Sequence, residues 1–129
     1  MLVTGSLPAM VDRFPLLIEE GETITTATRR FHVSEQDLAA VEAMRAFLIA
    51  EAAARSTVTY GELVATLRLP TPPKGLGRLL VLLSEDCERR GEPTLAAIVV
   101  TQSTGEVGDG YGAGARDDRA ELFDYWRDT

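Results

Sequence analysis

Cysteine, histidine and lysine occur once each in this chain of 129 residues, and asparagine is absent. The single cysteine, Cys87, excludes an intramolecular disulfide and a zinc site built on several thiolates. The single histidine, His32, has no serine or cysteine partner in a recognisable catalytic pattern. We therefore predict that the protein is not an enzyme and holds no metal ion or cofactor.

Long apolar runs are also lacking. The longest, Leu95 to Val100, is far too short to cross a bilayer, and the N-terminus lacks the basic and apolar regions of a secretory signal. Apolar residues make up 45% of the chain and charged residues 26%, as in ordinary globular proteins. We expect one cytoplasmic domain with no membrane partner, and the sequence leaves its oligomeric state open.

Positive charge is scarce, since 13 basic residues face 20 acidic ones and the net charge is −7. Such a balance argues against broad electrostatic adhesion to nucleic acid. One window departs from it: residues 56–84 carry three basic side chains and one acidic side chain, a net charge of +2. The regions on either side are both net negative.

Three helices are predicted in the middle of the chain, over residues 35–55, 60–67 and 74–90. The first begins with Ser34 and Asp37 in the spacing of a capping box, and the third ends at Gly91. Apolar side chains recur at helical spacing in the third helix and predict a buried stripe: Leu76, Leu79, Leu80, Leu83 and Cys87.

Shorter elements are expected around these helices. Residues 1–33 are interpreted as an arm or as short strands, and residues 57–60 as a short β-prone or capping segment. Residues 95–102, rich in β-branched side chains, predict a strand, and the glycine-rich residues 106–111 would return beside it. Asp117 or Asp118 is expected to cap a last helix.

This order of elements predicts an α+β fold that is mostly helical: a winged helix-turn-helix with a glycine-rich β-hairpin wing and an added C-terminal helix. We assign residues 1–33 to the arm or strands, 34–111 to the winged helix-turn-helix domain, and 112–129 to a glycine linker and an amphipathic helix. In such folds the third helix is the recognition helix.

Three short motifs carry a resemblance to a known family. The segment Thr59 to Val64 reads TYGELV, Pro73 to Leu80 reads PKGLGRLL, and Val99-Val100 is followed by Gly105 and by Gly110-Tyr111. In this order they resemble the winged helix-turn-helix of DNA alkyltransferases and alkyltransferase-like proteins. The resemblance covers roughly residues 57–111 and implies a DNA-binding scaffold.

The catalytic segment of that family is not matched. Its cysteine, histidine and arginine positions align with Ala96, Ala97 and Ile98, which offer neither a thiolate nor a base. The family's arginine finger aligns with Lys74, which lacks the planar group that stacks. The tyrosine that lies near a target phosphate in the family aligns with Tyr60. We therefore predict that the protein does not remove alkyl groups from DNA.

Two functions remain open, and DNA binding is slightly favoured because of the resemblance. A DNA-binding regulator or lesion-binding module would use Tyr60, Arg68, Lys74 and Arg78, the polar groups of the positive window. The alternative is an acidic protein-interaction module, such as an inhibitor, antitoxin or adaptor. It would use Val81 and Leu82, which lie roughly 120–140° from the centre of the buried stripe, together with Tyr125 and Trp126.

Overall fold

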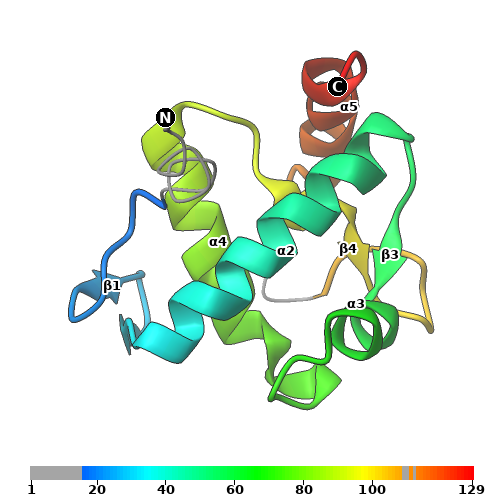
Figure 1. Cartoon of the computed structure of the whole chain (residues 1–129). Coiled ribbons are helices and arrows are strands. Elements are labelled where there is room, and N and C mark those ends of the chain that lie inside the picture. Colours follow the sequence, from blue (N-terminus) through cyan, green and yellow to red (C-terminus); the bar gives the residue numbers. More distant parts are fainter. Residues whose placement is uncertain (1–15, 109–110, 112) are drawn as a thin grey trace, which may run out of the picture.

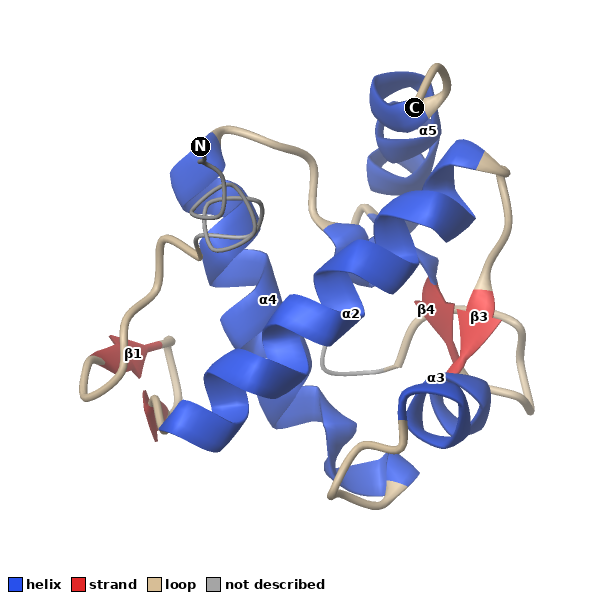
Figure 2. Cartoon of the chain, in the orientation of Figure 1, coloured by secondary structure: helices blue, strands red, loops and turns tan. Residues whose placement is uncertain are grey.

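The computed structural model describes residues 16–108, 111 and 113–129, with only the backbone at Lys74. This part of the chain is α+β and mostly helical, as predicted (Figures 1 and 2). Its α-helices are α2 (Glu35–Ala53), α3 (Tyr60–Leu67), α4 (Leu76–Arg90) and α5 (Ala115–Trp126). Two short 3₁₀ helices, η1 (Pro73–Gly75) and η2 (Leu95–Ile98), precede α4 and a strand respectively.

Local capping explains where the helices begin and end. Ser34 and Asp37 form the predicted capping box at the start of α2, and Thr59 with Glu62 forms a second box at the start of α3. Gly91 ends α4 in the left-handed conformation, with φ of 73°, which costs glycine little. These signals come from the sequence alone, which is why the three central helices lie close to their predicted positions.

The predicted cap of the last helix is wrong. Helix α5 begins at Ala115 after Gly114, which makes no side-chain capping bond, so Asp117 and Asp118 lie inside the first turn. There Asp118 accepts a hydrogen bond from the Tyr111 hydroxyl at 2.5 Å. The two carboxylates still favour the helix start, because the N-terminal end of the helix dipole is positive.

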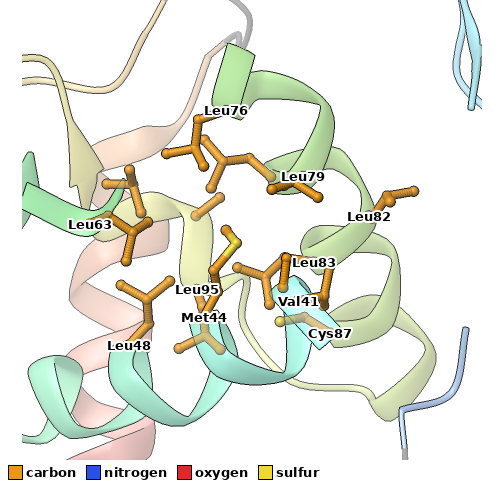
Figure 3. Close-up of a cluster of buried hydrophobic side chains, with 14 of the residues drawn as sticks. Val41, Met44, Leu48, Leu63, Leu76, Leu79, Leu82, Leu83, Cys87 and Leu95 are labelled. Atoms are coloured by element: carbon orange, nitrogen blue, oxygen red, sulfur yellow. The ribbon is translucent and has the colours of Figure 1, made fainter. Parts of the chain in front are cut away.

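The core lies between α2 and α4, with η2 and α3 at its edges. Val41, Met44 and Leu48 of α2 have no exposed surface, and neither do Leu83 and Cys87 of α4. Figure 3 shows these side chains pointing toward one another, with Leu63 and Leu76 at one end of the cluster. The predicted buried stripe of the third helix is therefore confirmed.

The predicted strand over residues 95–102 is mostly wrong. Residues 95–98 form η2, and only β4 (Val99–Val100) is a strand, which pairs in parallel with β3 (Val58–Thr59). Two contacts favour the helical turn over a longer strand. The Thr94 hydroxyl accepts a hydrogen bond from the Ala96 amide, and Arg119 Nε donates one to the Ala97 carbonyl at 3.0 Å.

The predicted hairpin after this strand is not observed among the described residues. Thr101 closes a turn by donating its amide to the Glu106 carbonyl at 2.8 Å, and the Gly105 amide donates back to Thr101. No second strand follows in residues 106–108. Residues 109 and 110 of the expected hairpin arm lie outside the described part of the chain.

Residues 16–33 form a segment that we call the N-terminal strap. It contains the antiparallel strands β1 (Thr23–Thr25) and β2 (Arg30–His32) and lies beside α4 (Figure 1). Ile18, Ile24 and Phe31 are 2–5% exposed and belong to the hydrophobic core. The strap is therefore packed against the helical part of the molecule.

Polar contacts hold the strap at both ends of α4. Near the C-terminal end, Arg89 forms an ion pair with Glu22 and donates to the Leu17 carbonyl at 2.9 Å. The Leu17 amide donates to Asp86, which is fully buried. Near the N-terminal end, Arg78 donates to the His32 carbonyl at 2.6 Å.

Candidate functional site

Helix α4 presents three faces. At about 100° per residue, its side chains fall into stripes that point about 120° apart. One stripe is the core face described above. The second is formed by Leu82 and Asp86, both fully buried. The third carries Gly77, Val81, Ser84 and Glu88, which are partly or fully exposed.

Leu82 lies on the face that the strap covers, so its predicted role in binding a partner is wrong. Its side chain points away from Val41 and Met44 in Figure 3 and has no exposed surface. The helical angle is as expected for a residue on the flank of the stripe. The strap, whose position the sequence could not predict, turns that flank into core.

The third face of α4 forms the floor of a groove of about 1230 Å³. One wall is the turn between β1 and β2, residues 26–29, together with Phe31. The opposite wall comes from α3, from η2 with its N-cap, and from the segment between η2 and α5. Its residues include Tyr60, Thr94, Ala96, Val99, Thr101, Val107, Gly108 and Tyr111.

The opposite wall is closely packed. A Cβ atom at Gly108 would lie 2.7 Å from the Tyr60 hydroxyl oxygen, so the loop can approach α3 this closely only because residue 108 is glycine. Tyr111 is fixed by its bond to Asp118, and burial raises the pKa of the Tyr111 hydroxyl, with the Asp118 carboxylate adding to the effect. The hydroxyl therefore stays protonated and supports the wall.

Besides Asp118 of α5, the groove has three carboxylates, and these lie toward the C-terminal end of α4. Glu85 is bound by Arg89 at 3.0 Å, and Glu92 by Arg45 at 2.7 Å. Glu88 is exposed, and its carboxylate has no ion-pair or hydrogen-bond partner within the described part of the chain. Helix α4 also ends here, so the negative end of its dipole adds to the acidic character.

The cations that line the groove, Arg29 and Arg78, are fewer than its carboxylates, and both make contacts within the chain. Arg78 forms a two-pronged ion pair with Asp37, and the Arg78 guanidinium lowers the pKa of the Asp37 carboxyl while its own pKa is raised. The Arg29 guanidinium lies over the Phe31 ring, 5.0 Å from its centroid. Arg78, one of the residues predicted to bind DNA, is therefore already paired with a carboxylate of the same chain.

The residues predicted to bind DNA are not all brought together. Tyr60 and Arg78 line the groove, whereas Arg68 does not. Arg68 is exposed at the C-terminal cap of α3, in the left-handed conformation with φ of 53°. The side chain of Lys74 lies outside the described part of the chain.

The residues predicted to bind a protein partner are also separated. Val81 lines the groove, but Tyr125 and Trp126 lie on α5 and contribute nothing to it. Tyr125 is 52% exposed, and its ring contacts that of Trp126 edge-on at 5.0 Å. Trp126 packs against the core, and the Arg45 guanidinium lies 5.8 Å from its ring. Trp126 therefore belongs to the edge of the core and not to the groove.

The positions that align with the family's catalytic segment are buried in η2. Ala96, Ala97 and Ile98 are at most 4% exposed. Cys87 has no exposed surface, and burial raises the pKa of its thiol, so little reactive thiolate forms at neutral pH. Among the described residues no group of histidine, cysteine or acidic side chains is arranged to hold a metal ion.

Sequence reasoning missed most of the groove. Its floor has a visible signal, because Gly77, Val81, Ser84 and Glu88 recur at helical spacing to one side of the core stripe. The wall made by residues 26–29 has no such signal, since it depends on where the strap packs.

No helix in the described ranges combines the length and the apolar character that crossing a membrane requires. Comparison with protein-family models, with curated proteins and with solved structures gave no match. The resemblance to alkyltransferase-like proteins therefore remains a prediction from three short motifs.

Proposed function

We propose that this chain is an acidic protein-interaction module of the cytoplasm, and that it binds a protein partner in the groove on α4. The observation that carries the proposal is the character of that helix face. Val81 offers an apolar contact in the middle of the floor, and Glu85 and Glu88 supply carboxylates toward its end. Apolar side chains with a charged rim are typical of a face that binds a protein segment.

The same face is poorly suited to the DNA backbone. A helix that enters the major groove carries basic and polar groups for phosphates and base edges. Here Arg78 is neutralised by Asp37, and the Glu88 carboxylate would face the phosphates. Arg29 is the other cation that lines the groove, and its guanidinium lies over the Phe31 ring. A net charge of −7 adds long-range repulsion from nucleic acid.

A photo-reactive amino acid at Val81 tests the proposal in the cells that express the chain. Irradiation is expected to join the chain to a protein, and the product should persist after nuclease treatment. The matched control places the same amino acid at Glu42, an exposed position of α2 that does not line the groove. Cross-linking to nucleic acid at Val81, or equal yields at both positions, would overturn the proposal.

DNA binding by a winged helix-turn-helix is the second candidate. It is favoured by the order α3, η1 and α4, by the resemblance of their sequences to alkyltransferase-like proteins, and by Arg68, which is exposed beside the turn. The variant to use is Arg68→Ala, because Arg78→Ala would also break the ion pair with Asp37. Binding of duplex, hairpin or single-stranded DNA at low salt, weakened by Arg68→Ala, would support this candidate.

A further inference from the structure

The floor of the groove has a regular spacing that suits a helix. Gly77, Val81, Ser84 and Glu88 follow one another at intervals of four, three and four residues. Such spacing lines up one side of a helix, and from Gly77 to Glu88 it extends for about 16 Å at 1.5 Å per residue. The floor is therefore long enough to contact about three turns of a second helix.

The floor permits close approach at its N-terminal end, at Gly77, and past its middle, at Ser84. A Cβ atom built at Gly77 would have no neighbour within 4 Å, so the backbone is uncovered there. Ser84 is small, and its hydroxyl lies 2.7 Å from that of Thr94, so its polar group already has a partner within the chain. An apolar partner surface can cover Ser84 without leaving that hydroxyl unpaired.

The C-terminal end of the floor favours a cation. At this end of the groove, Glu85 forms an ion pair with Arg89, and Glu92 forms one with Arg45. The third carboxylate, that of Glu88, has no such partner among the described residues. A partner that buried Glu88 without an opposite charge would lose the hydration of that carboxylate. A lysine or arginine of the partner placed here would compensate for the loss.

We infer that the groove binds an amphipathic helix of a protein partner, with apolar side chains over Val81 and a basic side chain at Glu88. This inference rests on the proposed function and names the chemistry of the partner. A basic amphipathic helix complements both the apolar floor and the acidic end, and it lies in the groove by the usual helix-in-groove mode. The net negative charge of the chain speeds its association with such a partner.

Two synthetic probes test the inference on the full chain. One is a fluorescent 18-residue peptide of leucine and lysine with helical periodicity, and the other has glutamate in place of every lysine. Fluorescence anisotropy at low salt is expected to show binding of the lysine peptide only. Equal binding of the glutamate peptide would overturn the inference, because charge would then play no part.

Matched variants separate the groove from general attraction to an acidic protein. Glu88→Gln is expected to weaken binding of the lysine peptide by about fivefold, an effect that salt should reduce. Glu42→Gln removes the same charge from an exposed position outside the groove and is expected to leave binding nearly unchanged. Equal losses in the two variants would overturn the inference.

The outcomes distinguish this inference from the proposed function. Suppose that Val81 cross-links to a protein but the lysine peptide binds equally well to Glu88→Gln and to the unmodified chain. The proposed function would then stand, and the inference that the partner is a basic helix would be wrong. If DNA binds and no protein is cross-linked, the proposed function itself fails.

Discussion

Val81 and Leu82 are neighbours on α4 with similar side chains, yet they lie in different environments. Leu82 has no exposed surface, whereas Val81 is only partly buried and lines the groove. Both lie on flanks of the core stripe, at about 140° and 240° from Leu76. The difference arises because the N-terminal strap covers one flank and nothing in the described part of the chain covers the other. A helix face becomes core or surface through segments far away in sequence.

Truncating the two side chains should give the largest contrast. Leu82→Ala is expected to lower the free energy of unfolding by about 2–5 kcal/mol, as other large-to-small core substitutions do. Val81→Ala should cost less than about 1 kcal/mol, because its side chain is partly solvated already. Denaturant unfolding measures both, and similar losses at the two positions would show that the strap does not bury Leu82.

The strap itself can be loosened at Asp86. This fully buried carboxylate accepts the Leu17 amide and Arg90 Nε. Asp86→Asn removes its charge and is expected to lower the free energy of unfolding by about 1.5–3 kcal/mol, the range for hydrogen bonds to charged groups. Hydrogen exchange over residues 16–33 should rise with it.

Asp124→Asn is the matched control for that change. Asp124 is exposed, with 74% of its side-chain surface accessible, and its contact with Arg127 is 3.6 Å long. A pair of this kind contributes little to stability, so the control should leave exchange in the strap unchanged. An increase in both variants would argue against a specific role for Asp86.

Acid should weaken the polar contacts around the strap. The Arg78 and Arg89 guanidinium groups lower the pKa values of Asp37 and Glu22 respectively. Because the unfolded chain then binds more protons, stability is complete above the ordinary pKa values and falls as the pH drops below about 4.5. Solvent screening limits the loss to about 1 kcal/mol for each pair. Asp37→Asn should flatten this pH dependence in denaturant unfolding, and an unchanged profile would contradict the assignment to Asp37.

The effect expected on stability at the groove is also small. Val81→Asp should lower the free energy of unfolding by about 1 kcal/mol, because the Val81 side chain is only partly buried where it packs against the core. The same change should abolish binding of the lysine peptide, because it places a carboxylate in the apolar part of the floor. A large loss of stability would mean that Val81 is part of the core.

The central helices and the core stripe could be predicted because their signals are local. Ser34 and Asp37 cap α2, Gly91 ends α4, and the apolar spacing of α4 marks its core face. The helical turn at residues 95–98 could not be predicted, because the run of β-branched side chains from Ile98 to Thr101 favours a strand. Tertiary contacts from Thr94 and Arg119 stabilise a 3₁₀ turn instead.

The candidate site was predictable only in part, for a related reason. Val81 and Tyr60 could be found from the helical pattern and the motif, and both line the groove. The ion pair between Arg78 and Asp37 joins residues 41 positions apart, so a local sequence pattern could not predict it. The same holds for the strap, whose apolar residues are few and whose fit on α4 depends on side chains along the whole helix.

Thiol labelling of Val81→Cys and Leu82→Cys tests most directly whether the two flanks of α4 differ. Cys87 is buried and serves as the internal reference in both variants. We expect the thiol introduced at Val81 to react rapidly in the native protein and to be protected when the lysine peptide is bound. The thiol introduced at Leu82 should react only as fast as the chain or the strap opens. Equal labelling rates at the two positions would contradict the account.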